Sequence, residues 1–310
     1  MPDMLLQAAI DAYLLASRAE GKSEKTISWY VGKLRQFVAS VGNVPLGNVD
    51  ANVLRTYILD LRQSNVRYAG QTRQRTGKLS LQTVRGHHQM LRAFYNWLVT
   101  EYDLDPKQNP MTKIKKPTVG QPEPKALDFA DFRRMLAVCD DSPMGRRNRA
   151  ILMFLADTGC RAGGLVSLTD AKLDLDQRRA IVHEKGNKDR YVHFLPVTAD
   201  VLFRWLDVRP AGASTVICAV NSRYSGQPLH VEGLHRVLAR VAKQAGVEGR
   251  SNPHGFRHMF AMESLENGND LVTVSNLLGH TNLKTTEYYL RFTEKQRAKR
   301  HDQYSPLINL

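Results

Sequence analysis

The chain has few cysteines and lacks any long apolar run. Its 310 residues hold three thiols, Cys139, Cys160 and Cys218. Three scattered cysteines make neither a disulfide framework nor a metal-binding box, so the sequence predicts a reducing, intracellular compartment. No apolar stretch is long enough to cross a bilayer, and no charged start followed by an apolar segment marks an export signal. A cytoplasmic protein that binds no membrane is therefore expected.

Acidic residues are missing from one long stretch. Between Leu61 and Thr100 there are six arginines and one lysine but no Asp or Glu, and the whole chain carries a net charge of +14. Such a balance indicates a polyanionic partner. A solvated basic face, or a basic protein on an acidic membrane surface, would also fit the charge alone. An acid-free run of this length favours contact with DNA phosphates.

The sequence shows no sign of a cofactor or metal. No glycine-rich loop of the nucleotide-binding kind occurs. His254, His258 and His280 lack an accompanying cysteine or carboxylate cluster at ligand spacing. We therefore expect neither a nucleotide cofactor nor a metal.

Periodicity divides the chain into two domains. Four amphipathic helices are expected within residues 1–103, the last three beginning after Ser23, Asp50 and Ser80, with Ser23 as an N-cap candidate. They predict a small helical bundle with a long loop over residues 65–79, and the acid-free stretch makes it the expected DNA-binding domain. Residues 104–124 hold five prolines and several lysines, which predicts an interdomain linker.

Residues 125–310 are expected to form a second, mostly helical domain with a small sheet and a C-terminal tail. Alternating residues at 180–183 and 191–195 flank a Lys-Gly-Asn-Lys turn, which is typical of a hairpin. The fold class is thus mainly α with a small β-sheet. The expected helices of this domain are one capped by Asp128 and others over residues 148–156, 198–207, 231–245, 253–267, 270–278 and 285–290.

Five short motifs concentrate the chemistry. Together they supply two arginines, two histidines and a lysine around a tyrosine. Fixed cations stabilise the charge that develops on a phosphate under attack, and a tyrosine hydroxyl is a suitable nucleophile. This set of side chains suits phosphoryl transfer from DNA without a metal. The motifs are Thr158-Gly159-Cys160-Arg161, Lys185-Gly186-Asn187-Lys188-Asp189-Arg190, His254-Gly255-Phe256-Arg257-His258, Leu277-Leu278-Gly279-His280 and Thr285-Thr286-Glu287-Tyr288-Tyr289.

In order and spacing these motifs resemble the tyrosine recombinase (phage integrase) family, and most closely its simple two-domain members of the Xer-like or transposon type. The resemblance implies an N-terminal four-helix core-binding bundle and an α+β catalytic domain that form a C-shaped clamp on DNA. It implies strand cutting and rejoining through a covalent 3′-phosphotyrosyl intermediate and a Holliday junction, independent of metal and ATP. The implied partners are double-stranded DNA with a specific site and a homotetramer on two duplexes, in the nucleoid. An accessory DNA-bending protein is allowed but not specified.

The resemblance also assigns the catalytic residues. Counting from His280, the family spacing selects Tyr289 rather than Tyr288 as the nucleophile. Lys185, first in its motif, would be the general acid toward the leaving 5′-oxygen. His254 would be a general base or phosphate ligand, and His280 would donate a hydrogen bond to the scissile phosphate. The implied catalytic set is Arg161, Lys185, His254, Arg257, His280 and Tyr289.

Ten further basic residues are candidates for DNA contact. They lie in the acid-free stretch, in the lysine-bearing linker and on the hairpin of the catalytic domain. They are Arg67, Arg73, Arg75, Lys78, Arg85, Lys113, Lys115, Lys116, Lys188 and Arg190.

One position departs from the family pattern. Three residues after Arg161 the family usually has an acidic residue, and here Gly164 stands there beside Gly163. Two adjacent glycines weaken a helix, so Arg161 is expected to be held less rigidly. The alternative function is a non-catalytic DNA-binding protein that keeps the recombinase fold.

Overall fold

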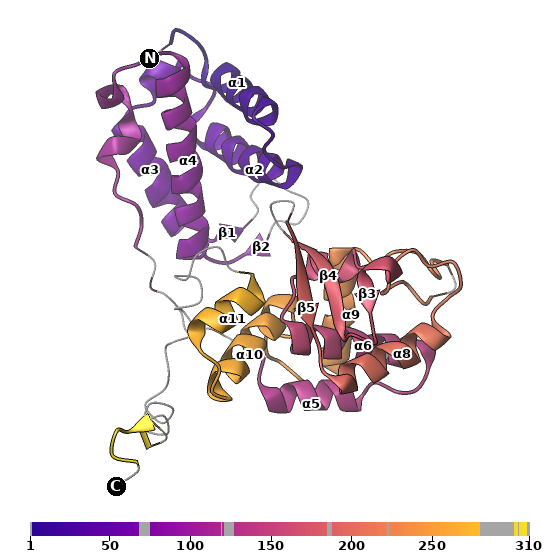
Figure 1. Cartoon of the computed structure of the whole chain (residues 1–310). Helices are drawn as coiled ribbons and strands as arrows, with labels where there is room; N and C mark the ends of the chain where they lie inside the picture. The colour runs from indigo at the N-terminus through magenta and orange to yellow at the C-terminus, as the bar shows by residue number, and fades with distance from the viewer. Residues whose placement is uncertain are drawn as a thin grey trace. The chain divides into compact units, whose positions relative to one another are not determined.

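The computed structural model describes residues 2–67, 75–118, 120, 127–184, 188–221, 223–279, 301–302 and 304–308 (Figure 1). The chain divides into two compact units, residues 1–121 and 122–310. Helices make up most of the described residues of both units, with a two-stranded sheet in the first and a three-stranded sheet in the second. The predicted class, mainly α with a small β-sheet, is confirmed.

The first unit is a bundle of four helices around one apolar core. Phe37, Leu54 and Phe94 are fully buried in it. Ser23 and Ser80 cap their helices by accepting the backbone N–H groups of residues three further on, and Asp50 caps a third. The sequence predicted that helices start after these three residues, and it named Ser23 as an N-cap. The helices are α1 (Leu6–Ala19), α2 (Glu24–Val41), α3 (Ala51–Gln63) and α4 (Leu81–Glu101), with a short 3₁₀ helix η1 (Leu46–Asn48).

Two segments of this unit differ from the expectation. The predicted loop 65–79 contains a short antiparallel pair, β1 (Val66–Arg67) with β2 (Arg75–Thr76). Part of the predicted linker, the 3₁₀ helices η2 (Pro106–Gln108) and η3 (Pro110–Lys113), belongs to the bundle. Met111 explains this, because its side chain is buried in the bundle core and anchors η3 there.

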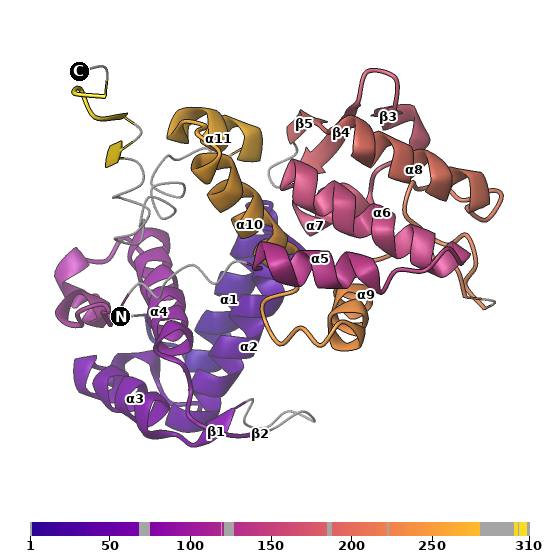
Figure 2. The same cartoon turned by 90° about the horizontal axis from the view of Figure 1, so that it is seen from below.

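The second unit surrounds a larger core with helices and a small sheet (Figure 2). Its central helix is α6, which packs against α8 and α10 and against β5. The predicted helices are present where the structure describes them, and the expected helix at 285–290 lies outside the described residues. The helices are α5 (Phe129–Ala137), α6 (Pro143–Thr158), α7 (Ala162–Val166), η4 (Asp170–Lys172), α8 (Pro196–Val208), α9 (Val231–Gln244), α10 (Pro253–Glu266) and α11 (Leu271–Leu278).

The sheet of this unit is antiparallel, in the order β3 (Leu173–Asp174), β4 (Arg179–Glu184) and β5 (Lys188–His193). The predicted hairpin is confirmed, and its last pair is Glu184 with Lys188. Strand β5 starts and ends earlier than the expected strand 191–195. Strand β3 is too short to leave an alternating pattern and was not predicted.

Helix α7 was also not predicted, because Gly163 and Gly164 disfavour a helix. Packing offsets this preference. A Cβ atom added at Gly164 would lie 3.1 Å from the Cβ of Val182, so the glycine lets α7 pack closely on β4. Among the described residues, no helix is both long and apolar enough to span a membrane.

Candidate active site

The turn that carries Arg161 is built by the end of α6. Gly159 has a left-handed backbone, with φ +56°, and ends the helix there. A Cβ atom at this position would lie 2.8 Å from the ring of Phe260 in α10 and 2.9 Å from Leu278 in α11. Glycine is therefore needed both for the turn and for the close approach of three helices. Arg161 follows as the N-cap residue of α7 and is half-buried.

Arg257 is fixed at the same junction. It lies in the first turns of α10, a helix capped by the side chain of Asn252. Its side chain is 4% exposed, and it donates from Nη1 to the Gly159 carbonyl oxygen at 2.9 Å and from Nη2 to the Leu278 carbonyl oxygen at 2.6 Å. The guanidinium thus joins α10 to the end of α6 and the end of α11. His254 is exposed, one turn earlier on α10.

Arg190 reaches this junction from the sheet. It lies on β5, is half-buried, and donates from Nη1 to the Leu277 carbonyl oxygen at 2.6 Å. The sequence indicated Arg190 only as a DNA contact, one basic residue of a hairpin. Its approach to α11 depends on a tertiary contact between residues 87 apart, which no local pattern could reveal.

Burial lowers the pKa of two arginines at this junction, and like charge adds to the effect at one of them. Burial, and then the positive charge of Arg190, lower the pKa of the Arg161 guanidinium. Burial also lowers the pKa of Arg190. The carbonyl acceptors described for Arg190 and Arg257 are uncharged. Three guanidinium groups therefore concentrate positive charge at one junction, which suits a phosphate anion. We call Arg161, Arg190 and Arg257 the arginine cluster.

A second histidine lies beside the cluster. Burial, and then the positive charges of His254, Arg250 and Arg257, lower the pKa of His258 to about 4. His258 is therefore neutral near pH 7, and it was assigned no role from the sequence. The buried Cys160 has a raised pKa through burial, so it is a neutral thiol rather than a nucleophile.

The β4–β5 hairpin is held by an acidic residue next to its closing pair. Asp189 accepts from Lys172 Nζ at 2.9 Å and lies 2.7 Å from His183 Nδ1. Hydrogen bonds from Lys172 and then His183 lower the pKa of its carboxyl group. Sequence reasoning missed this residue, although Asp189 is the one acid in its motif. The contact with Lys172 attaches the hairpin to η4, ahead of β3, whereas His183 lies on β4 and joins the two strands of the hairpin.

Three of the six implied catalytic residues, Lys185, His280 and Tyr289, lie outside the described residues. The structure brings together Arg161 and Arg257, with His254 nearby on α10. The described stretch 223–279 ends at Gly279, which terminates α11 with a left-handed backbone. His280 is the next residue, so the arginine cluster surrounds the helix end that leads directly into it.

The remaining DNA-contact candidates lie mostly in the first unit. Lys78, Lys113, Lys115 and Lys116 are exposed, whereas Arg85 is half-buried on α4. For the others the structure gives only the backbone or nothing. Arg67, Arg75 and Lys188 are strand residues by their backbone, and Arg73 lies outside the described residues.

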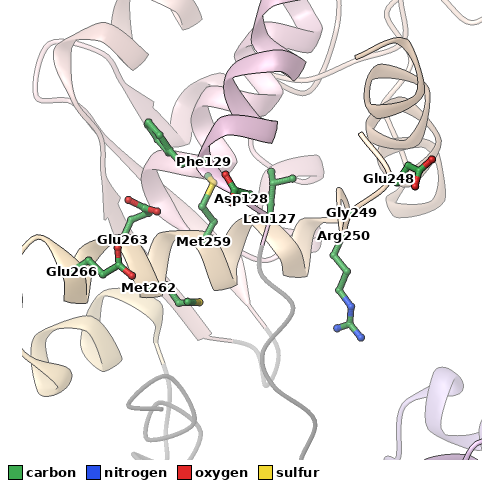
Figure 3. A pocket seen from close by; sticks show the side chains of 10 residues that line it. All are labelled: Leu127, Asp128, Phe129, Glu248, Gly249, Arg250, Met259, Met262, Glu263 and Glu266. Atoms are coloured by element: carbon green, nitrogen blue, oxygen red, sulfur yellow. The ribbon is translucent and has the colours of Figure 1, made fainter. Parts of the chain in front are cut away.

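A cavity of about 820 Å³ lies in the second unit, away from the arginine cluster (Figure 3). Glu263 and Glu266 from α10, Asp128 ahead of α5 and Glu248 line it, together with apolar groups such as Met259. Burial, and then the charges of Glu266 and Asp128, raise the pKa of Glu263. An acidic cavity repels a phosphate backbone, so the arginine cluster is the better candidate site.

A helical bundle joined to a mostly helical unit with clustered arginines is the architecture of tyrosine recombinases. The phage integrase family model matches residues 125–296, and the chain belongs to this family of tyrosine recombinases. It is similar to tyrosine recombinase XerD of Listeria monocytogenes serotype 4b (strain F2365), at 32% identity over 95% of this chain and 96% of the relative. It is also similar to tyrosine recombinase XerC of Bacillus pumilus (strain SAFR-032), at 32% identity over 74% of this chain and 76% of the relative.

Solved structures show the same fold. A lambda integrase tetramer bound to a Holliday junction matches with a TM-score of 0.73 and 16% identity, over 94% of this chain and 80% of that one. XerH site-specific recombinase bound to a palindromic difH substrate matches with a TM-score of 0.71 and 19% identity, over 92% of this chain and 82% of that one. Tyrosine recombinases are site-specific DNA recombinases, which fits the chemistry expected from the motifs.

Proposed function

We propose that this chain cuts and rejoins DNA at a specific site through its own Tyr289. The observation that carries the proposal is the arginine cluster at the junction of α6, α10 and α11. Helix α11 ends there at Gly279, and His280 is the next residue. Arg161 and Arg257 bind the scissile phosphate and stabilise the charge on its equatorial oxygens. Tyr289 attacks the phosphorus, a 3′-phosphotyrosyl bond forms, and the bond to the 5′-oxygen breaks.

The other implied residues handle protons and phosphate. Lys185 gives a proton to the leaving 5′-oxygen. His254, exposed on α10, binds the phosphate or takes the tyrosine proton, and His280 donates a hydrogen bond to the phosphate. Rejoining reverses these steps, because the phosphotyrosine conserves the bond energy and no ATP is needed. Neither step requires a metal, since the fixed guanidinium groups supply the positive charge.

The partners of this proposal are duplex DNA and further copies of the chain. The first unit contacts DNA through its exposed lysines and the acid-free stretch. Four copies act on two duplexes through a Holliday junction, as the lambda integrase tetramer bound to such a junction suggests. The reaction takes place in the nucleoid.

The proposal is tested by covalent capture. The protein is mixed with a pool of nicked suicide duplexes of randomised sequence, and DNA that stays attached after denaturation in SDS is sequenced. We expect covalent adducts on one recurring sequence, in excess EDTA and without ATP. Tyr289→Phe should bind that duplex and form no adduct, whereas the matched control Tyr288→Phe should form it.

Two outcomes would contradict the proposal. Binding to a recurring sequence without any wild-type adduct would support the non-catalytic DNA-binding alternative. An adduct with the Tyr289→Phe variant would mean that another residue is the nucleophile.

A further inference from the structure

Arg190 connects two parts of the second unit that carry different catalytic groups. Its backbone is held in β5, where it pairs with Val182 of β4. Its guanidinium crosses to α11 and donates to the Leu277 carbonyl oxygen at 2.6 Å. A charged donor on a carbonyl oxygen makes a short and directional hydrogen bond, so this contact joins the hairpin firmly to α11.

The α11 end of this connection is fixed by two arginines on consecutive carbonyl groups. Arg190 binds the carbonyl of Leu277 and Arg257 binds that of Leu278. The last carbonyls of a helix lack partners within the helix and carry partial negative charge, so they attract cations. Gly279 then ends the helix in a left-handed conformation. The two guanidinium groups therefore determine where the chain leaves α11 toward His280.

The hairpin end of the connection is held on both faces of β5. Neighbouring strand residues point to opposite faces, so Asp189 and Arg190 act on different sides. Asp189 holds one face through Lys172 and His183, and Arg190 holds the other through α11. Only three residues, 185–187, separate Glu184 from Lys188 in the closing pair of the hairpin. Lys185 thus follows directly from a strand pair whose position Arg190 sets.

We propose that Arg190 is a positioning residue that sets the hairpin bearing Lys185 against the end of α11 that leads to His280. Through this contact the proton donor, Lys185, and the phosphate-binding histidine, His280, act on the same phosphate. The role differs from the DNA contact expected from the sequence, and it rests on the proposed function, since it assumes that Lys185 is the general acid. The charge of Arg190 also adds to the potential at Arg161.

The test measures how cleavage depends on the leaving group. Cleavage is followed with an ordinary duplex and with one that has a 5′-bridging sulfur at the scissile bond, which leaves without a proton. Arg190→Met keeps the aliphatic stem and removes the donor. We expect it to slow ordinary cleavage by on the order of tenfold to a hundredfold, because general-acid catalysis contributes about 10²–10⁴. The sulfur duplex should restore most of that loss, as it should for Lys185→Ala.

A second variant separates position from charge. Arg190→Lys keeps the charge, but its ammonium reaches less far and lacks the fork of a guanidinium. We expect it to behave like Arg190→Met. The matched control is Arg179→Met on β4, where a half-buried arginine pairs with Asp174 at 3.5 Å, and its cleavage should be unchanged on both duplexes. Thermal unfolding of each variant shows whether the fold is retained.

Failure of this inference is distinguishable from failure of the proposed function. If Lys185→Ala is rescued by sulfur and Arg190→Met is not, the proposed function stands and Arg190 does not position the general acid. Full ordinary cleavage by Arg190→Lys would likewise show that Arg190 acts through charge alone. If Tyr289→Phe still forms the adduct, the proposed function itself is wrong.

Discussion

Nη1 of Arg257 donates to the carbonyl oxygen of Gly159 at 2.9 Å, so the arginine of α10 is bonded two residues before Arg161. The two arginines implied in phosphate binding are therefore positioned by one shared turn rather than by independent elements. Gly159 makes this possible, since its left-handed backbone directs its carbonyl and lets α10 and α11 approach. Changes at the turn and at either arginine should consequently affect the same step.

Replacing Arg257 by lysine should slow strand cleavage strongly without preventing DNA binding. Lysine keeps one charge but cannot hold both the Gly159 and the Leu278 carbonyls in the arrangement of a planar fork. Loss of one preorganised donor to a transition state costs on the order of 10²–10³ in rate. Single-turnover cleavage of the selected suicide duplex measures this, with a binding assay alongside. A rate within twofold of wild type would show that charge alone is needed at this position.

Gly159→Ala should destabilise the second unit. A left-handed conformation costs a residue with a Cβ atom roughly 1–2 kcal/mol, and the new methyl group would overlap Phe260 and Leu278. The control is Gly163→Ala, where an added Cβ meets no atom within 4 Å and the backbone is helical. Urea unfolding should show a loss for the first variant and a slight gain or no change for the second. Equal stability of the two would mean that the turn relaxes without cost.

Gly164→Glu restores the acidic residue usual in the family, yet it should impair this protein. Its Cβ atom would lie 3.1 Å from that of Val182, so α7 would have to move away from β4. We expect lower stability and slower cleavage, because Arg161 begins α7 and the β4–β5 hairpin carries Lys185. The matched control, Gly163→Glu, places the same charge at an exposed neighbour. Faster cleavage by Gly164→Glu would show that the missing carboxylate, and not the packing, limits this site.

Local patterns predicted where the helices start, since the N-caps Ser23, Asp50, Ser80 and Asp128 act through residues two or three positions away. Features that depend on long-range packing were missed. Helix α7 packs closely on β4, a strand later in the chain, because Gly164 has no side chain. Met111, in a proline-rich segment, is buried in the core of the bundle. The motifs predicted that Arg161 and Arg257 share one site, and the structure holds both at the turn of Gly159. They could not show that Arg190 joins them, because its acceptor lies on α11.

The exposed lysines of η3 and the following segment should contribute to the salt dependence of DNA binding. Lys113, Lys115 and Lys116 are all exposed. Each phosphate contact contributes about 0.9 to the slope of log affinity against log salt. Changing the three to glutamine should therefore reduce that slope by roughly 2–3 and weaken binding to all duplexes alike. Filter binding between low and moderate salt measures it, and an unchanged slope would make these lysines a solvated face.

The stability of the first unit should fall as the pH drops below about 6.5, through His87. This residue of α4 is 2% exposed, and its Nδ1 lies 2.8 Å from the Tyr57 hydroxyl. Burial, and then the nearby charge of Lys33 on α2, lower its pKa to about 3. In the unfolded chain histidine titrates near 6.5, so between pH 6.5 and 3 only the unfolded state binds this proton. The folded state then loses up to about 1.4 kcal/mol of stability per pH unit.

Hydrogen exchange isolates this effect from the other titrating groups. Peptides from α3 and α4 report the opening free energy of the bundle at pH 7, 6 and 5. His87→Asn keeps an acceptor for Tyr57 but does not titrate, so its pH slope should be shallower than that of the wild type. Because the proton binds to the unfolded state, the two proteins should differ in slope only below pH 6.5, and the wild type should lose more. Parallel slopes would show that His87 is protonated in the folded bundle and that its burial is incomplete.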